Sequence, residues 1–404
     1  TVTAPAPGSV IDLNGTSFDP DKIDTANPSI IFEVTAINGV AYASFPASIL
    51  ARLEGNNADF LIEIKTQYGS YQIPVNLASL IPGLEDLLIA NNLKVEDISF
   101  KINLTDMSDD KDIREALASR LPNGRTMGSI VDFSIEWINN STGKRIGTAE
   151  QFTKALVRII PMPKNATSMP EQWGAFRYNE SAKQFEFVPA QSVRFDGVWY
   201  VMIHSYSNSV YVVAHNEVSF ADVQSHWSKP FVGLAAAKGL INGVGGGKYA
   251  PDKSVTRAEF AAMLVNALGR GTSTGNHSAP YGDVRPAAWY YDAVTKAKQL
   301  GLLGFVKDNQ FLPDKPLTRE EMASMLAAAI ALEKAAITKE FVSLEGYKDI
   351  GGMDTAYLED VRLMVKLNIM TGTSKDTFDP EGESTRAQAA VVFIRLLQTL
   401  DLID

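Results

Sequence analysis

Three arginines recur in the C-terminal half of the sequence, each as the second residue of a Thr-Arg-x-Glu/Gln motif that an apolar helical run follows. They are Arg257, Arg319 and Arg386. A planar guanidinium binds a carboxylate through two parallel hydrogen bonds, and the free amides at a helix start are further donors to an anion. The pattern therefore predicts an anion beside each arginine, which is either the carboxylate of a bound ligand or an acidic side chain of a neighbouring repeat.

The other residues of the motif have a structural explanation. Thr-x-x-Glu/Gln is a capping box, in which the threonine hydroxyl accepts from the third helical amide and the Glu or Gln side chain accepts from the threonine amide. The three pairs are Thr256 with Glu259, Thr318 with Glu321, and Thr385 with Gln388. Capping does not explain the arginines, because a cation in the first turn faces the positive end of the helix dipole.

The motif is the last part of a longer pattern that occurs three times. Each copy opens with an aromatic residue and an aspartate, continues with a second aromatic and a helix, and ends in a loop before the motif. The aspartates are Asp222, Asp283 and Asp349, and the second aromatics are Trp227, Trp289 and Tyr357. The separation from aspartate to motif threonine is 34, 35 and 36 residues. The C-terminal half is therefore a repeat array.

This pattern resembles the surface-layer homology (SLH) family over about residues 219 to 402. The resemblance implies three repeats, 219–274, 275–343 and 344–404, that form an all-α trimer around a pseudo-threefold axis with grooves between the lobes. It also implies that the grooves bind an anionic secondary cell-wall polysaccharide, commonly through pyruvylated N-acetylmannosamine. The pyruvate ketal of that sugar supplies a carboxylate for an arginine.

The resemblance and the residue chemistry give a set of candidate ligand-binding residues. Besides the three arginines, they are Trp227, Trp289, Tyr357, Gly243, Gly372, Thr373, Ser374, Asp222 and Asp283. The aromatic side chains either stack on a sugar face or pack in the core. The aspartates accept from sugar hydroxyls, hold an arginine or cap a helix. The glycines either let the loop backbone approach a ligand or form a turn with positive φ.

The second repeat departs from this pattern at Phe305. Gly243 and Gly372 lie 13 residues before the motif threonine, and Phe305 takes that place in the second repeat unless a one-residue gap brings in Gly304. A benzyl side chain there fills the space of a sugar or holds the loop away from it, which predicts fewer than three strong sites. Alternatively, Phe305 turns inward, replaces core volume and leaves the groove open.

Residues 1 to 218 follow a β-type pattern, in which β-branched and alternating segments are separated by turn residues. The expected strands are 30–35, 40–45, 60–65, 71–75, 98–104, 130–138, 185–188, 199–204 and 209–213, and the expected short helices are 47–53, 84–91 and 111–121. We divide this part into an N-terminal extension (1–26), a β-rich module (27–160) and a small β unit (161–218). The predicted fold class is multidomain, with β-rich (α+β) N-terminal modules followed by the all-α SLH trimer.

Composition and charge limit the function classes. The net charge of -10 argues against a nucleic-acid partner, and the absence of cysteine excludes disulfides and thiolate chemistry. No apolar run is long enough for a membrane span. Neither a His-Glu-x-x-His nor a Gly-x-Ser-x-Gly signature is present, so we expect no enzyme activity, no cofactor and no metal site. A wall-anchored glycan hydrolase with its active site in the N-terminal half is the alternative.

The sequence thus predicts a cell-surface protein that is held noncovalently on the Gram-positive wall. It serves either as a self-associating subunit of a surface lattice or as an accessory protein. The first residue is Thr1 rather than Met, which indicates a processed terminus or a fragment, so the export signal is expected outside this sequence.

Overall fold

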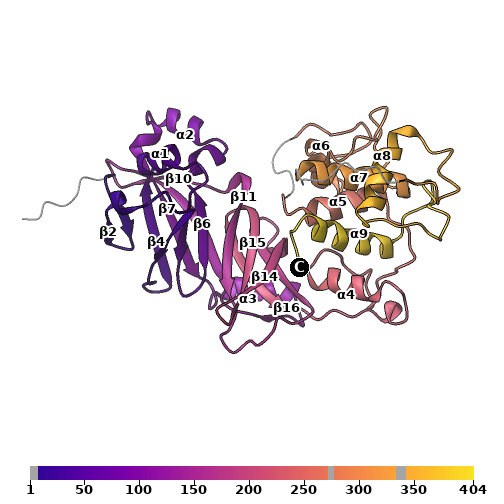
Figure 1. Cartoon of the computed structure of the whole chain (residues 1–404), viewed down its shortest axis with the longest axis horizontal. Coiled ribbons are helices and arrows are strands. Elements are labelled where there is room, and N and C mark those ends of the chain that lie inside the picture. The colour runs from indigo at the N-terminus through magenta and orange to yellow at the C-terminus, as the bar shows by residue number, and fades with distance from the viewer. Residues whose placement is uncertain (1–7, 272–276, 334–342) are drawn as a thin grey trace, which may run out of the picture. The chain divides into compact units, whose positions relative to one another are not determined.

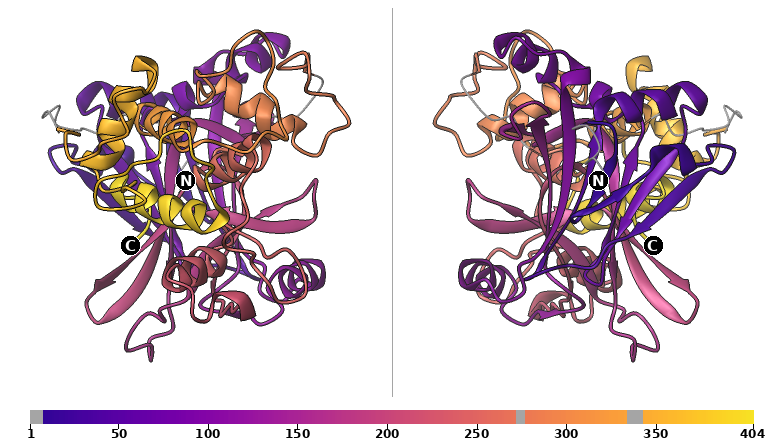
Figure 2. Two further views of the ribbon diagram at one scale, coloured as in Figure 1. Left: turned by 90° about the vertical axis from the view of Figure 1, so that its right-hand side faces the viewer. Right: turned by 90° about the vertical axis from the view of Figure 1, so that its left-hand side faces the viewer.

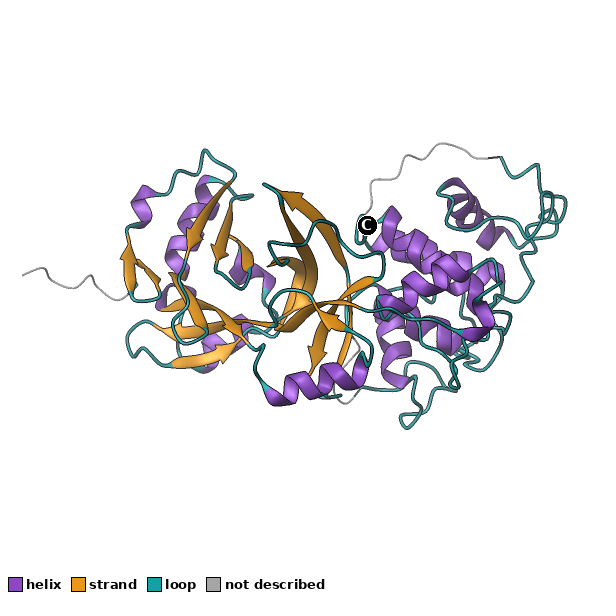
Figure 3. Ribbon diagram, turned by 90° about the horizontal axis from the view of Figure 1, so that it is seen from below, coloured by secondary structure: helices purple, strands orange, loops and turns teal. Residues whose placement is uncertain are grey.

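The computed structural model describes residues 8–271, 277–333 and 343–404, which form two compact units (Figure 1). Unit 1 comprises Thr1–Pro170 and Ala175–His215, and unit 2 comprises Glu171–Gly174 and Asn216–Asp404. Strands are the main regular elements of unit 1 and helices those of unit 2 (Figure 3). This confirms the prediction of a β-rich N-terminal part that precedes a helical C-terminal part.

Unit 1 is built on two β-sheets. The larger sheet contains β1 (Ile11–Leu13), β2 (Thr16–Phe18), β4 (Val40–Pro46), β7 (Ile98–Asp106), β8 (Arg125–Thr126), β9 (Val131–Asn139), β10 (Arg145–Thr148), β12 (Trp173–Asn179), β13 (Gln184–Val188) and β16 (Ser209–His215). Its strand order is β13-β12-β16-β9-β7-β4-β1-β2, with β10 beside β9 and β8 beside β16. The smaller sheet contains β3 (Ser29–Glu33), β5 (Leu61–Lys65), β6 (Ser70–Pro74), β11 (Gln151–Pro161), β14 (Ala190–Phe195) and β15 (Val198–Ser207), in the order β14-β15-β11-β6-β5-β3.

The core of unit 1 lies between these sheets. Along β9, fully buried residues alternate with half-buried ones, as expected for a strand with one face on the core. Phe133 of β9 packs edge to face on Tyr71 of β6, with ring centroids 5.3 Å apart. Tyr211 of β16 lies 5.9 Å from Phe133. Aromatic side chains from both sheets therefore meet in the interior.

The helices of unit 1 lie in the connections between its strands. They are α1 (Ala47–Asn56), α2 (Leu84–Ala90) and α3 (Lys111–Arg120), with the short 3-10 helices η1 (Pro20–Lys22), η2 (Leu77–Leu80) and η3 (Val95–Asp97). The apolar face of α3 buries Ile113 and Leu117 in one cluster with Phe185 of β13. Each strand and helix predicted for residues 30–213 is present within a few residues of its expected bounds, whereas β1, β2, β8, β10, β11, β12 and β14 were not predicted.

The predicted division of unit 1 into three segments is wrong, because backbone pairing joins them. In the expected extension, residues 1–7 lie outside the described residues, but β1 pairs with β2 and with β4. β11, which ends the expected module 27–160, pairs with β15 of the expected small unit 161–218. Apart from 171–174, residues up to His215 belong to one unit.

Unit 2 contains the three repeats. Its helices are η4 (Ala221–Val223), α4 (Lys229–Ala237) and α5 (Arg257–Ala267) in repeat 1, α6 (Tyr291–Gln299) and α7 (Arg319–Leu332) in repeat 2, and α8 (Thr355–Lys366) and α9 (Arg386–Thr399) in repeat 3. α5 packs on α6, α7 on α8, and α9 on α4, as can be followed in Figures 1 and 2. The second helix of each repeat thus packs on the first helix of the next repeat, and repeat 3 closes on repeat 1.

The interior of unit 2 is apolar. Phe260 of α5 stacks on Phe393 of α9, with ring centroids 5.0 Å apart. The alanine- and leucine-rich helices α5, α7 and α9 bury most of their residues. In the described part of the chain, no helix combines the length and the apolarity that crossing a bilayer requires.

Candidate functional site

The motif at the start of α5, α7 and α9 forms the predicted capping box in all three repeats. In α5, the amide of Glu259 donates to the hydroxyl of Thr256 at 3.1 Å, and the Glu259 carboxylate accepts from the Thr256 amide at 2.9 Å. The same two bonds are made by Thr318 with Glu321, and by Thr385 with Gln388. The capping prediction is confirmed.

The first two amides of each of these helices donate to a loop of the next repeat. In α5, Arg257 N donates to Lys315 O at 2.9 Å and Ala258 N donates to Pro313 O at 3.0 Å. In α7, the amides of Arg319 and Glu320 donate to Gly382 O and Pro380 O. In α9, those of Arg386 and Ala387 donate to Lys253 O and Pro251 O. These amides are therefore not free for an anion, which corrects that part of the prediction.

Each arginine side chain follows the same cyclic order. We call its contact with the next repeat a junction. Junction 1–2 joins Arg257 to the loop 305–311 and Glu321. Junction 2–3 joins Arg319 to the loop 371–378, and junction 3–1 joins Arg386 to the loop 242–249. The three junctions therefore share one arrangement of arginine and loop, and junction 1–2 adds the contact with Glu321 of α7.

At junction 1–2 the arginine is paired inside the protein. Nε of Arg257 donates to Oε2 of Glu321 at 3.2 Å, Nη2 donates to the other carboxylate oxygen, and Nη1 donates to Phe311 O at 2.9 Å. The two side chains are 8% and 5% exposed. At this junction the anion is an acidic side chain of the next repeat, which was one of the two predicted alternatives.

At the other two junctions the arginines contact backbone carbonyls. Arg319 donates from Nε to Phe378 O at 2.9 Å and from Nη2 to Thr371 O at 2.5 Å. Arg386 donates from Nε to Tyr249 O and from Nη2 to Asn242 O, both at 2.7 Å. Each guanidinium also lies over the aromatic ring of its loop, at 4.8 Å and 4.5 Å from the centroid. Among the described residues, no carboxylate lies within 4.0 Å of either arginine.

The repeat aspartates fix the loops that meet these arginines. The two carboxylate oxygens of Asp222 accept from the amides of Tyr249 and Ala250 at 2.9 and 2.7 Å. Asp283 and Asp349 hold the equivalent two amides of their own loops. Ala250 has a φ of 56°, a conformation that needs such support in a residue with a Cβ. All the accepting oxygens named here serve loop geometry.

Gly243 and Gly372 allow close packing inside their own loops. A Cβ on Gly243 would lie 2.7 Å from the Phe220 ring and 2.8 Å from Lys248 O. A Cβ on Gly372 would lie 2.6 Å from the Tyr347 ring. Neither glycine has a positive φ, so a special turn conformation is not the reason for them. Beside Gly372, Thr373 and Ser374 are exposed, and both of their amides donate to Thr377 O.

Phe305 is buried, with 8% of its surface exposed, and its ring lies 4.9 Å from the guanidinium carbon of Arg257. Its loop also differs in its hydrogen bonds. In the other repeats, the residue after the glycine donates across the loop, from Val244 to Lys248 O and from Thr373 to Thr377 O. In the second repeat, Val306 N instead donates to Leu303 O. Phe305 thus turns inward, as one of the two alternatives predicted, and its loop has a different hydrogen bond from the other two.

The second aromatics of the repeats lie at the surface or close to it. Trp227 is 61% exposed and Trp289 is 68% exposed, so the core-packing alternative is wrong for both. Tyr357 is half-buried. Burial, followed by the charges of Glu321 and Glu320, raises the pKa of Tyr357 to about 12, whereas Arg257 lowers it. Tyr357 thus lies near junction 1–2.

Glu320 is a residue that the sequence analysis did not identify as special. Its Oε2 is buried and has no hydrogen-bond partner in the described structure. Burial, followed by the charges of Glu381 and Glu321, raises the pKa of Glu320 to about 7. The sequence does mark Glu320 as different, because the same position of the motif is alanine in the other repeats, at Ala258 and Ala387.

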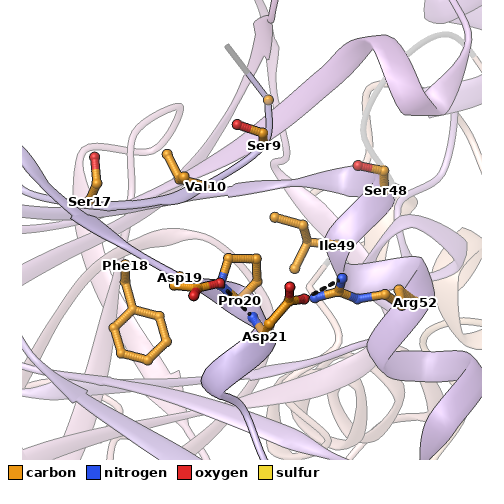
Figure 4. Close-up of a pocket in the computed structure, with 11 residues that line it drawn as sticks. Ser9, Val10, Ser17, Phe18, Asp19, Pro20, Asp21, Ser48, Ile49 and Arg52 are labelled. Carbon is orange, nitrogen blue, oxygen red and sulfur yellow. Dashed lines mark hydrogen bonds and ion pairs between the residues drawn. The ribbon is translucent and has the colours of Figure 1, made fainter. Parts of the chain in front are cut away.

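Unit 1 has a cavity of about 550 Å³ beside η1 and α1 (Figure 4). Asp19 and Asp21 line it, and both have partners. The Asp19 carboxylate accepts from the Asp21 amide at 3.0 Å, and Asp21 pairs with Arg52 at 2.8 Å. Within residues 8–271, 277–333 and 343–404, no three His, Asp or Glu side chains gather as metal ligands.

Comparison with known proteins finds one family in the C-terminal half and several similar proteins. The S-layer homology domain matches residues 219–261, 280–323 and 346–390. The surface-layer 125 kDa protein of Lysinibacillus sphaericus is 31% identical over 180 residues, which are 44% of this chain and 14% of that protein. The S-layer protein of Bacillus thuringiensis subsp. finitimus is 27% identical over 173 residues, 43% of this chain and 20% of that protein.

A further similar protein is named as an enzyme. The amylopullulanase of Thermoanaerobacterium thermosulfurigenes is 27% identical over 274 residues, 68% of this chain and 14% of that protein. The matches thus span a fifth or less of each of these relatives. Three successive matches at the positions of the three repeats confirm the resemblance, and the C-terminal half of this chain contains three S-layer homology domains.

Proposed function

We propose that the three S-layer homology domains hold this chain noncovalently on the Gram-positive cell wall by binding an anionic polysaccharide. Pyruvylated N-acetylmannosamine is the unit that we propose they recognise. The observation that carries the proposal is the succession of three S-layer homology domains. This chain also matches relatives named as surface-layer and S-layer proteins, which supports export and a place at the cell surface.

We also propose that the three repeats form one lobed body around a pseudo-threefold axis. The cyclic order of the helix amides, from repeat 1 to 2, 2 to 3 and 3 to 1, supports this arrangement. A ring of three backbone hydrogen bonds supports it further. Val255 N donates to Ser384 O, Ser384 N donates to Leu317 O, and Leu317 N donates to Val255 O, all at 2.8 to 2.9 Å.

The chemistry of binding centres on Arg319 and Arg386 in this proposal. In the described structure, Nη1 of each makes no hydrogen bond, and neither atom is among the buried polar atoms without a partner. Arg386 is half-buried, whereas Arg319 is 4% exposed, so Nη1 is more accessible to a ligand at Arg386. A ketal carboxylate at Nη1 would be the carboxylate partner that these two guanidinium groups lack among the described residues. The backbone carbonyls meanwhile hold both groups in place. The exposed Trp227 and Trp289 offer apolar ring faces for sugars.

Sedimentation of the full chain with purified Gram-positive walls tests this function. We expect co-sedimentation with native walls and its loss after chemical removal of pyruvate. Arg319→Lys/Arg386→Lys should weaken binding by about 2 to 5 kcal/mol, because an ammonium group keeps the charge but cannot hold both loop carbonyls and also present a donor to the ligand as the planar guanidinium does. Arg194→Lys changes an exposed arginine of unit 1 and serves as the control. Equal sedimentation with walls that lack pyruvate would reject the proposed ligand.

One observation favours a second candidate, a glycan hydrolase in the N-terminal half. The amylopullulanase match is 274 residues long, more than the 186 residues from 219 to 404, so it includes residues before 219. The paired state of Asp19 and Asp21 in the unit 1 cavity gives this candidate no free carboxylate pair there. We therefore propose an anchor rather than an enzyme. Release of reducing sugar from amylopectin or from wall glycan by the full chain would reverse that choice.

Self-association is a separate part of the proposal. We propose that the chain contributes to a surface lattice, because it is similar to relatives named as surface-layer and S-layer proteins. Electron microscopy of the full chain on wall fragments tests this, since a lattice subunit forms ordered sheets whereas an accessory protein remains dispersed.

A further inference from the structure

We infer that junction 1–2 does not bind the anionic glycan, and that Phe305 and Glu321 exclude it. This inference rests on the proposed function, which it narrows to junctions 2–3 and 3–1. It follows from the hydrogen bonds of Arg257, from the loop around Phe305 and from the charges nearby.

The donors of Arg257 are already used. Nε and Nη2 donate to the two oxygens of Glu321, and Nη1 donates to Phe311 O. At the equivalent arginines, by contrast, Nη1 makes no hydrogen bond in the described structure, both at the half-buried Arg386 and at Arg319, which is itself 4% exposed. A ligand carboxylate would therefore have to compete with Glu321 at this junction but with no side-chain carboxylate at the other two.

Displacement of Glu321 is unfavourable for two reasons. Its side chain is 5% exposed, so separation from Arg257 would leave a buried carboxylate with Lys315, 3.5 Å away, as its remaining ion-pair partner. The same carboxylate accepts from the Thr318 amide at 3.2 Å and caps α7. The ligand would thus have to break both an ion pair and a helix cap.

Phe305 explains why this arginine takes a different partner. At junctions 2–3 and 3–1, Nη2 of the arginine donates to the carbonyl just before the loop glycine, at Thr371 and Asn242. With Phe305 in the glycine's place, the loop folds differently and the benzyl ring packs against the Arg257 guanidinium. The guanidinium is turned toward Glu321 as a result.

The surroundings of junction 1–2 are also acidic. Tyr357, which lies near Arg257, is close enough to Glu320 and Glu321 for both charges to act on it. The buried Oε2 of Glu320 has no partner in the described structure. An anionic sugar that approached Arg257 would meet these carboxylates. Nearby charge alone does not distinguish the junctions, because Asp379 and Asp349 act on Arg319, so the direct contact of Arg257 with Glu321 carries the difference.

Calorimetric titration of the full chain with the methyl glycoside of pyruvylated N-acetylmannosamine tests the inference. We expect two equivalents per chain. Arg319→Lys and Arg386→Lys should each remove one equivalent, and Arg257→Lys should leave both. A thermal melt of each variant verifies folding. If Arg257→Lys does not fold, Arg257→Met/Glu321→Gln takes its place. This variant removes both charges of the pair and should also bind two equivalents.

The outcomes separate the two proposals. The inference is supported if the Arg257 variant binds the same number of ligand equivalents, with the same affinity, as the unmodified chain. Three equivalents in the unmodified chain, or a folded Arg257 variant that loses an equivalent, would overturn it and leave the proposed function intact. Absence of binding to the unmodified chain would overturn the proposed function and, with it, this inference.

Discussion

Arg257 and Glu321 form a buried ion pair between repeats 1 and 2, across 64 residues of sequence. Their side chains are 8% and 5% exposed. The guanidinium and carboxylate meet through two hydrogen bonds, and the same carboxylate caps α7. An arginine that the repeat pattern marks as a ligand contact therefore holds two repeats together.

The first prediction concerns this pair. Arg257→Met should lower the free energy of unfolding by about 3 to 5 kcal/mol, because it leaves the Glu321 carboxylate buried without its cation. Arg257→Met/Glu321→Met should recover much of that loss, since no buried charge remains. Urea unfolding of the full chain, monitored by a probe in the helical unit, measures the free energy of unfolding of both variants. Lys111→Ala breaks an exposed ion pair with Glu115 and should have little effect. A double variant as unstable as the single one would mean that cap and packing matter more than charge.

A second prediction concerns Arg158 in unit 1, which is fully buried and has no carboxylate partner in the described structure. Its guanidinium donates to Ser205 O at 3.1 Å and to Ser207 O at 2.7 Å, and it lies 4.7 Å from the Tyr71 ring centroid. Arg158→Met should destabilise unit 1 by about 3 kcal/mol, because it leaves buried carbonyls unpaired. Arg194→Met, at an exposed position on β14, is the control. Equal stability of the two variants in chemical denaturation would contradict this role.

Arg158 also shows where sequence reasoning about the fold reached its limit. Strands with regular apolar alternation, such as β4, β7 and β9, were predicted because one face of each is buried. β11 was missed because Lys154 and Arg158 interrupt its apolar pattern, and Arg158 is buried only through contacts with residues far away in the sequence. Periodicity carries no information on such contacts.

The candidate site likewise has a part that could be predicted from the sequence and a part that could not. The capping boxes are local and were predicted from spacing alone. The partners of the arginines were not, because they depend on which loop meets which helix in three dimensions. Arg319, for example, contacts carbonyls 52 and 59 residues away. Even the three copies of one motif differ, since Arg257 packs against Phe305 and donates to Glu321, whereas the other two arginines donate to loop carbonyls.

The third prediction concerns pH. The pKa of Glu320 is raised to about 7 from its usual 4.5, so the folded chain holds a proton that the unfolded chain releases between these values. The Glu320 carboxyl therefore lowers the free energy of unfolding progressively as pH rises from about 4.5 to 7, and this destabilisation is complete above pH 7. Glu320→Gln should stabilise the chain at pH 8 by at most about 1 kcal/mol, since solvent screens a half-exposed carboxyl. The gain should disappear near pH 5.

Thermal melts of Glu320→Gln and the unmodified chain across pH 5 to 8 measure this difference. Glu345→Gln removes an exposed carboxylate from repeat 3 and controls for the change in net charge. Asp360 of α8, whose pKa burial raises to about 6, should give both proteins a shared decline in stability over part of the range. A stability difference between the two proteins that is constant with pH would show that the Glu320 carboxyl does not titrate in this window.

The last prediction concerns Trp227 and Trp289, which are 61% and 68% exposed in the first two repeats. Side chains this exposed contribute little to the core, so Trp227→Ala/Trp289→Ala should melt at nearly the same temperature as the unmodified chain. If the rings stack on wall sugars, the same variant should bind walls with an affinity loss of about 0.5 to 1.5 kcal/mol per ring. Phe195→Ala is the matched control, because Phe195 is a 71% exposed aromatic of unit 1, and its loss should not change wall binding. Sedimentation isotherms on purified walls give the affinities. A tryptophan variant that binds as tightly as the Phe195 variant would remove both rings from the proposed glycan contact and leave the arginines of junctions 2–3 and 3–1 as its remaining support.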